Sequence, residues 1–303
     1  MVTAAIFSLL PVKPNSTIAS VRIARWLSDL LGVELLDGPQ IGDKELDVLF
    51  IVNGSTLFCK CLPQLAKAVS TAKQVVWIQN DYTLPPPKAE SDAQSPFRKA
   101  FAARNLTPHF WTTCDENADR TQGSELVNWN SLGYTTGLHK APLSSEAFFY
   151  YGAYRSHRVG AFNHIDRCLD NWVVSSTSKK FLSHPNAELV PPMPRAAFFN
   201  TLKDYGLGIY AQDSKSTYKN HQPATRFYEM LSVGLPMVFT PDCVLTMRQY
   251  GYDVAPYVLV DAGLRTARAH IAAEQQAWVR DFEADLKHQV RKLYDRILYQ
   301  RTS

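Results

Sequence analysis

Residues 220–240 combine polar side chains suited to a phosphorylated ligand with the signals that begin and end a helix. Pro223 suits the first helical position, where its missing N–H costs no hydrogen bond, and Gly234 suits the position after the last turn. The free N–H groups and positive dipole end of such a helix start favour a diphosphate. Arg226 and Glu229 lie near one face, and a carboxylate there can accept hydrogen bonds from both hydroxyls of a ribose. The same spacing also describes an amphipathic helix with an Arg226–Glu229 pair on its surface.

The elements that position this segment begin with an alternation of short apolar runs and helical periods in the first half of the chain. The runs of strand length are residues 4–10, 33–36, 48–53, 75–80 and 108–113. Helices are predicted from about residue 17 to Gly32 and over residues 62–71. Strands that alternate with helices indicate a parallel sheet covered on both faces.

The same alternation restarts in the second half. The predicted strands are residues 148–152, 172–175, 207–211, 237–240 and 257–260. An amphipathic helix ends the sequence, with apolar residues every three or four positions at Trp278, Phe282, Leu286, Val290, Leu293 and Ile297. Residues 115–145 are predicted to be irregular, with a linker at about 140–145. We therefore predict an α/β fold with Rossmann-like, doubly wound domains over residues 1–142 and 143–275 and a long C-terminal helix over 276–303.

Length and composition fit this division. A chain of 303 residues is suited to two domains of about 150 residues each. A net charge of +4 allows an anionic ligand or acceptor, although an ordinary solvated surface gives the same count. The five cysteines lack the spacing of a zinc site, so we expect reduced thiols, no metal and a cytoplasmic location. Residues 1–10 are typical of a buried first strand rather than a signal peptide, and no apolar run predicts a membrane span.

The order of helix, Gly234-Leu235-Pro236 and apolar strand resembles the donor-binding signature of GT-B glycosyltransferases. The resemblance implies two Rossmann-like domains that face a cleft, with a nucleotide sugar bound to the second. Two acidic residues eight apart often flank the helix start in that family, and Glu229 matches the second, which binds the ribose. His221 stands at the first position, so the retaining mechanism of the large subgroup is not implied, and His221 is a candidate sugar contact.

The resemblance also points to the strand and turn before this segment. GT-B transferases commonly place a strand, a glycine and a basic residue where they meet the donor diphosphate. Here Gly152 would permit close approach of the backbone, and Arg155 or Arg158 would stabilise the departing nucleotide diphosphate without a metal. Either arginine can also be an ordinary solvated side chain. Together with Thr225 and Arg226, these residues complete the predicted donor site, for which a UDP-sugar is favoured as co-substrate and no cofactor is expected.

The first half matches the family by architecture, and its strand ends supply the candidate acceptor site. Ligands of open α/β sheets bind beyond the carboxyl ends of the strands. Asp81 follows such a strand and is a candidate general base for an inverting mechanism, or else a cap of the following turn. Asn15, Asn53 and Tyr82 occupy similar strand-end positions and are candidate acceptor contacts.

Residues 220–229 look more like phage enzymes that glycosylate hydroxymethylated pyrimidines in DNA than like cell-wall enzymes. This resemblance implies double-stranded DNA as a partner and a monomer that acts in the host cytoplasm. Tyr82 or Trp111 would then support a flipped base. Basic residues would meet phosphates or form one solvated helix face, namely Lys88, Arg98, Lys99 and Arg104.

Two other classes of function remain open. One is transfer to a glycan, lipid or protein in the cytosol. The other is a nucleotide-sugar epimerase or a non-catalytic nucleotide-binding module of the same architecture. Release of free nucleotide diphosphate only after an acceptor is added would distinguish a transferase from the second class.

Overall fold

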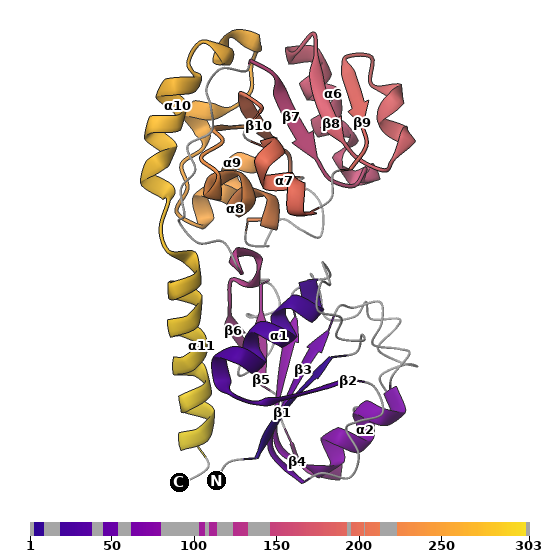
Figure 1. The fold of residues 1–303 in the computed structure, drawn as a ribbon, viewed down its shortest axis with the longest axis vertical. Coiled ribbons are helices and arrows are strands. Elements are labelled where there is room, and N and C mark those ends of the chain that lie inside the picture. Colours follow the sequence, from indigo (N-terminus) through magenta and orange to yellow (C-terminus); the bar gives the residue numbers. More distant parts are fainter. Residues whose placement is uncertain are drawn as a thin grey trace. The chain divides into compact units, whose positions relative to one another are not determined.

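The chain forms two compact units, Met1–Leu132 with Ala284–Ser303, and Gly133–Glu283. We refer to them as unit 1 and unit 2 (Figure 1). The computed structural model describes residues 3–8, 19–37, 45–53, 62–79, 103–106, 109–113, 124–132, 146–192, 195–202, 204–212 and 223–300.

Unit 1 contains a six-stranded sheet in which every neighbouring pair is parallel. Its spatial order is β2 (Glu34–Asp37), β1 (Ala4–Ser8), β3 (Leu46–Asn53), β4 (Ala72–Gln79), β5 (His109–Thr112) and β6 (Ser124–Leu126). The chain reverses its direction of winding between β1 and β3. Crossover connections of a parallel sheet bury both of its faces, which explains the continuous apolar runs in the sequence.

Successive side chains of these strands enter two apolar clusters, one on each face of the sheet. Ile6, Phe50 and Val76 pack with α1 (Ala19–Leu31) and with α11 (Phe282–Tyr299). The residues next to them on the strands, such as Phe7 and Ile51, pack with α2 (Leu62–Thr71). Helix α1 ends at Gly32, whose φ of +64° confirms the predicted terminator.

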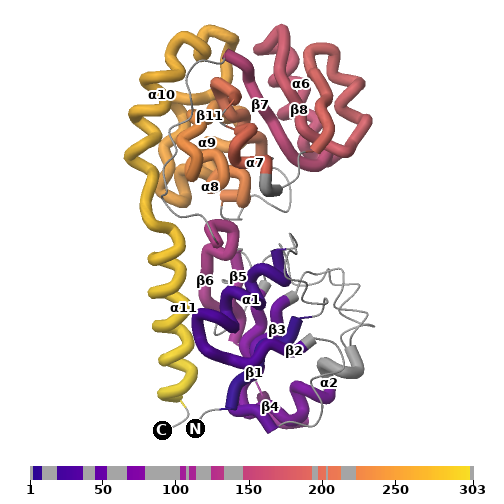
Figure 2. The backbone as a smooth tube through the Cα atoms, viewed as in Figure 1, coloured from indigo at the N-terminus to yellow at the C-terminus, as the bar shows by residue number. Residues whose placement is uncertain are grey.

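The helix α11 completes the core of unit 1. Leu286, Val290, Leu293 and Ile297 are each buried against the cluster that α1 covers. Gln289 Nε2 donates to the Leu126 carbonyl at 2.7 Å, and Arg296 forms an ion pair with Glu125, so α11 lies beside β6 (Figure 2).

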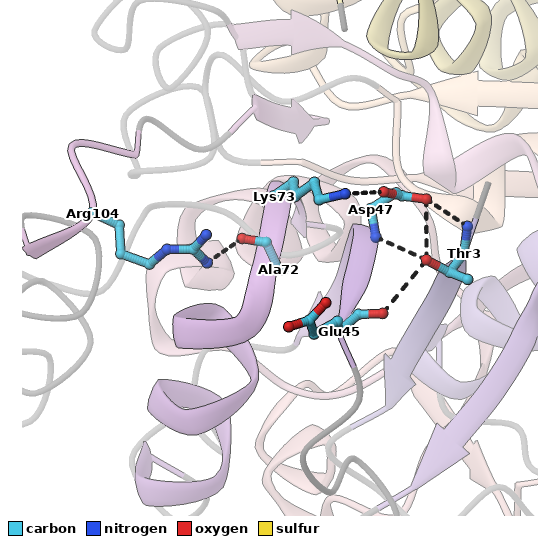
Figure 3. A network of polar contacts seen from close by, with 6 residues as sticks. All are labelled: Thr3, Glu45, Asp47, Ala72, Lys73 and Arg104. Atoms are coloured by element: carbon cyan, nitrogen blue, oxygen red, sulfur yellow. Dashed lines mark hydrogen bonds and ion pairs between the residues drawn. The ribbon is translucent and has the colours of Figure 1, made fainter.

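A polar network fastens the amino ends of three strands in unit 1 (Figure 3). The buried Asp47 carboxylate accepts from the Thr3 backbone N–H at 2.8 Å and from Lys73 Nζ at 2.9 Å. Arg104 Nη1 donates to the Ala72 carbonyl and to the Ser70 carbonyl, the latter at 2.9 Å. Arg104, which we expected as a phosphate contact, therefore caps the end of α2.

Unit 2 contains a five-stranded parallel sheet in the order β11 (Met237–Phe239), β10 (Leu207–Tyr210), β7 (Phe148–Tyr151), β8 (Trp172–Ser175) and β9 (Ala187–Val190). The α-helices of this unit are α6 (Val159–Cys168), α7 (Arg195–Leu202), α8 (Thr225–Ser232), α9 (Cys243–Gln249) and α10 (Arg268–Gln275). Here the winding reverses between β7 and β10, as it does between the two halves of a dinucleotide-binding fold.

Unit 1 also contains the 3₁₀ turn η3 (Trp129–Ser131), which follows β6. The 3₁₀ turns of unit 2 are η4 (Ser156–Arg158), η5 (Lys179–Ser183), η6 (Ala255–Tyr257), η7 (Ala262–Arg265) and η8 (Gln276–Trp278). Lys179 and Lys180, which follow β8, lie in η5.

The structure corrects four elements of the sequence analysis. Residues 115–145 include the strand β6 and the turn η3, and β9 was not predicted. Residues 257–260 do not form a strand, because η6 leaves only one parallel bridge, between Phe239 and Val258. The predicted terminal helix is divided, since η8 precedes a break and α11 begins at Phe282. No helix among the described residues is long and apolar enough to cross a membrane.

Candidate functional site

The carboxyl ends of β7 and β10 meet at the point where the sheet of unit 2 reverses its winding. In open α/β sheets the connections from two such strands leave toward opposite faces, and ligands bind beyond the strand ends at this point. Helix α8 follows β10 in the chain and contacts it, and the first turn of α8 carries Arg226. The residues discussed next belong to these two strand ends and to α8.

Two guanidinium groups converge on one buried phenol. Arg226 Nη1 donates to Tyr150 Oη at 2.8 Å, and Arg158 Nη1 lies 3.5 Å from the same oxygen. Arg226 comes from α8, whereas Arg158 ends η4, which follows β7. Tyr150 itself is fully buried. The structure thus brings together two of the predicted donor-site arginines, Arg158 and Arg226.

The electrostatics of this group follow from burial and from the two like charges. Burial and the neighbouring Arg226 charge lower the pKa of Arg158. Burial alone would raise the pKa of Tyr150, but the Arg226 and Arg158 charges together lower it below its usual value. Among the described residues, no carboxylate pairs with Arg158 or Arg226, and Arg158 Nε is buried without a hydrogen-bond partner. The group is therefore a cationic site suited to an anionic ligand.

Gly152 keeps the space beside these atoms open. Its φ of +136° is a conformation that residues with side chains rarely adopt. A Cβ atom at this position would lie 3.5 Å from Tyr150 Oη and 3.6 Å from Arg226 Nη1. The backbone turn after β7 therefore leaves free the place that a side chain would fill.

Glu229 is a buried carboxylate, only 3% exposed. Tyr151 Oη, at the end of β7, donates to Glu229 Oε2 at 2.7 Å and lies 3.2 Å from the Arg226 carbonyl. The alternative in which Arg226 and Glu229 form a surface pair is therefore wrong. Instead, each side chain of the pair is held by a different tyrosine of β7.

The start of α8 is held by a third tyrosine. Tyr210 Oη, at the end of β10, accepts from the Ala224 backbone N–H at 2.9 Å and donates to Gln212 Oε1. Ala224 is extended and forms the N-cap, and Thr225 is the first helical residue. Pro223 therefore precedes the N-cap and lies two positions before the first helical residue, where it was predicted. Helix α8 ends as predicted at Gly234, with φ of +69°.

The remaining predicted site residues do not join this group of side chains or lie outside the described residues. Arg155 is described and exposed, and it does not join the Tyr150 group. Asn53 ends β3, which adjoins the reversal point of unit 1, but its side chain lies outside the described residues. Other candidates lie wholly outside them, namely Asn15, Asp81, Tyr82, Lys88, Arg98, Lys99 and His221. Trp111 is a core residue, 1% exposed and packed on Phe50 and Trp129, so it does not support a flipped base.

Sequence reasoning missed the tyrosines Tyr150, Tyr151 and Tyr210. Each belongs to an apolar strand, where an aromatic residue is expected in the core. Their positions at the carboxyl ends of two strands were a signal, because a buried phenol there must find a hydrogen-bond partner.

Comparison with solved structures gives the fold. No family model and no curated protein matches the sequence. An alpha-glucosyltransferase in complex with UDP aligns with a TM-score of 0.61 at 10% identity, over 98% of this chain and 100% of that one. The chain shares its fold with that enzyme. The predicted α/β class with two doubly wound halves of GT-B type is thereby confirmed.

Two further structures agree with this fold. An alpha-glucosyltransferase in complex with UDP-glucose and DNA containing an abasic site aligns with a TM-score of 0.60 at 11% identity, over 98% of this chain and 99% of that one. The DNA modifying enzyme beta-glucosyltransferase also aligns with a TM-score of 0.60 at 11% identity, over 98% and 97% of the two chains.

Proposed function

We propose that this protein is a glycosyltransferase that moves a sugar from a UDP-sugar to the hydroxyl of a 5-hydroxymethylpyrimidine in DNA. The observation that carries the proposal is the convergence of Arg158 and Arg226 on Tyr150 at the winding reversal of unit 2. A pair of guanidinium groups that no carboxylate of the described residues neutralises matches the two phosphates of a nucleotide sugar.

In this proposal the donor diphosphate binds between Arg158, Arg226 and the first N–H groups of α8. When the bond between the sugar and the diphosphate breaks, negative charge collects on the leaving phosphate oxygen. The two guanidinium groups are already in place to stabilise that charge, so they act more strongly in the transition state than in the ground state. Because this charge is supplied by arginines, we expect the reaction to need no added metal ion.

The rest of the donor lies along the same edge. Glu229, held by Tyr151, accepts the ribose hydroxyls. Thr225, at the first position of α8, lies beside the diphosphate. Arg155 and His221 remain proposed contacts at the rim. Arg155 is exposed and free to move toward a bound sugar nucleotide.

The acceptor is assigned to unit 1. Asp81 follows β4 by two residues and is proposed as the general base that deprotonates the acceptor hydroxyl, which implies inversion at the sugar carbon. Asn15, Asn53 and Tyr82 are proposed acceptor contacts. The position of Asn53 at the end of β3, beside the winding reversal of unit 1, supports this assignment.

The choice of DNA rests on the neighbours in fold. Three of them were solved with DNA, which contains an abasic site in one structure and an HMU base in another. Both alignments cover 98% of this chain, so both of its units are included in the similarity. We place the reaction in the cytoplasm, where duplex DNA and UDP-sugars occur together.

The test is transfer of radiolabel from UDP-glucose and other UDP-sugars to duplexes that contain 5-hydroxymethylcytosine, 5-hydroxymethyluracil or neither base. We expect label in a hydroxymethylated duplex only, and none with Arg226→Gln. The matched control is Arg248→Gln. It removes an exposed guanidinium of α9 that forms an ion pair with Asp253. If no UDP-sugar labels DNA while a glycan, lipid or protein acceptor is labelled, the DNA assignment is wrong. If UDP is released without any acceptor, the transferase assignment is wrong.

A further inference from the structure

Arg158 and Arg226 present a physical problem that the site has to solve. Both guanidinium groups carry a full positive charge, and both lie within 3.5 Å of one oxygen atom. Two like charges that contact the same atom repel each other, and each arginine side chain has many rotamers in which it could move away. Some group must therefore hold both arginines together before the ligand arrives.

Tyr150 is placed to do this because its own position is fixed. The residue is fully buried in β7, and its ring packs edge-on against Phe162 and Trp172 at centroid distances of 5.3 and 6.4 Å. Phe181 adds a third ring contact at 5.9 Å. A phenol ring confined in this way holds its oxygen at one point in space.

Arg226 is also held by ring faces. Its Cζ atom lies 5.4 Å from the Tyr150 ring centroid and 5.7 Å from the Tyr210 ring centroid. Contacts between a guanidinium and aromatic rings fix the plane of the group as well as its place. The open side of the arrangement is the turn at Gly152, where a ligand oxygen can reach the atoms that a Cβ would contact.

We propose that Tyr150 is a positioning residue of the donor site, whose phenol oxygen holds Arg158 and Arg226 in the geometry that a nucleoside diphosphate requires. This inference rests on the proposed function and adds a specific consequence to it. Tyr150 sets the affinity for the diphosphate part of the donor and has no influence on the nucleoside part. The lowered pKa of the Tyr150 phenol agrees with an oxygen that accepts from two cations.

The test compares UDP with uridine by isothermal titration calorimetry on wild-type protein and Tyr150→Phe. We expect the variant to bind UDP about 10-fold more weakly, the effect of one hydrogen bond to a charged group, and to bind uridine unchanged. Tyr154→Phe is the matched control, since that tyrosine makes ring contacts with Phe162 and Phe181 and its hydroxyl has no hydrogen bond among the described residues. It should bind both molecules as the wild type does.

A double-mutant cycle with Arg226→Lys separates positioning from general weakening. Lysine keeps the charge and loses the planar fork, so the Tyr150 oxygen no longer fixes the orientation of a guanidinium at this position. We expect Tyr150→Phe to weaken UDP binding clearly less in the Arg226→Lys background than in the wild type. Additive losses would overturn the positioning role.

Other outcomes are equally decisive. Equal weakening of UDP and uridine by Tyr150→Phe would make Tyr150 a structural residue only. If Tyr150→Phe fails to fold, 4-aminophenylalanine at position 150 keeps the ring and replaces the oxygen with a weaker acceptor, and it should still lower the affinity for UDP alone. Unchanged UDP affinity would overturn the inference and leave the proposed function intact. Wild-type protein that binds no nucleoside diphosphate would overturn both.

Discussion

At the scale of single residues, Glu229 has an unusual environment for a carboxylate on a short helix. It is 3% exposed, and its Oε2 atom accepts a hydrogen bond from the Tyr151 hydroxyl. A buried carboxylate is costly unless it is hydrogen-bonded, so the Tyr151 contact constrains its orientation.

For Glu229→Gln we expect about 10-fold weaker binding of UDP, because a neutral amide replaces a charged acceptor for the ribose hydroxyls. The loss should be smaller for 2′-deoxyuridine diphosphate, which has one hydroxyl fewer. Calorimetric titration of both nucleotides measures this difference. Glu188→Gln, on the exposed face of β9, is the control and should leave both affinities unchanged. An equal loss for the two nucleotides would contradict the ribose role.

Gly152→Ala should weaken both the site and the fold. Its φ of +136° makes any side chain strained, at a cost of about 1–3 kcal/mol, and the new methyl group would stand beside Tyr150 Oη and Arg226 Nη1. We expect a lower free energy of unfolding in urea and about 10-fold weaker UDP binding, the loss set by the displaced contact of a charged group. Gly160→Ala is the control, because its new Cβ would meet no atom within 4 Å apart from its chain neighbours and the backbone of its own helix. Unchanged UDP binding by Gly152→Ala would show that the open space is not used.

These residues also show which parts of the candidate site can be predicted from the sequence. Gly152, Arg158, Arg226 and Glu229 were predicted, because glycine turns, basic residues and helix starts leave clear local patterns. The tyrosines were not, since a phenol at a strand end has the same local signature as a core aromatic. Only the register of β7 beside β10 reveals which strand ends lie at the reversal of winding.

At the scale of elements, Asp47 connects the amino ends of β1, β3 and β4 (Figure 3). Asp47→Ala removes the acceptor of the Thr3 N–H in a buried position, so the free energy of unfolding should fall by about 3 kcal/mol. Lys73 is 57% exposed, and water can replace its contact, so Lys73→Ala should cost less than about 1 kcal/mol. Urea unfolding measures both changes. Similar losses for the two variants would mean that the ion pair, rather than the Thr3 contact, provides the stability.

The elements that the sequence missed have a common cause. β6 and β9 are edge strands of three and four residues, and most of their side chains are only partly buried. Their apolar signal is therefore weak, and pairing with a neighbour decides that they are strands. Residues 257–260 show the reverse case, where an apolar run lies next to Pro256 and pairs only at Val258. The long strands β3 and β4 were predicted because their central residues are buried on both faces, and such burial needs continuous apolar residues.

At the scale of the whole molecule, the contribution of α11 to unit 1 can be measured. Leu293 is 4% exposed in the unit 1 core, so Leu293→Ala should destabilise that unit by about 2–5 kcal/mol. The neighbouring Lys292 is exposed, and Lys292→Ala should change stability by less than about 0.5 kcal/mol. Hydrogen exchange would show the effect as lost protection of β1 and β3 with β7 and β10 unchanged. If β1 and β3 were protected from exchange in Leu293→Ala as strongly as in the wild type, this role of α11 would be contradicted.

The proposed DNA acceptor has a second, independent signature in its dependence on salt. A protein that neutralises phosphates releases counterions, so its affinity for a duplex falls steeply as salt increases. Fluorescence anisotropy with a hydroxymethylated duplex between about 50 and 200 mM salt should show at least a 10-fold loss of affinity for a few phosphate contacts. An affinity that does not change with salt would argue against duplex DNA as the partner.

The division of the sequence into folding domains at residues 142 and 275 stays a prediction. The contacts themselves group α11 with the strands of unit 1, although about 150 residues of unit 2 separate them in the chain. Helical periodicity identified an amphipathic stripe in α11. It carried no information about which core the stripe completes, because any apolar surface of the right width would suit it.

This return of α11 to unit 1 has a consequence for protein synthesis. Unit 2 is one continuous stretch, Gly133–Glu283, whereas unit 1 needs residues from both sides of it. Translation therefore delivers every residue of unit 2 before Leu286 to Ile297 leave the ribosome. We expect the usual order, in which the N-terminal domain folds first, to be reversed here. The nascent unit 1 would keep part of one apolar sheet face exposed, beside α1, until the ribosome has made α11.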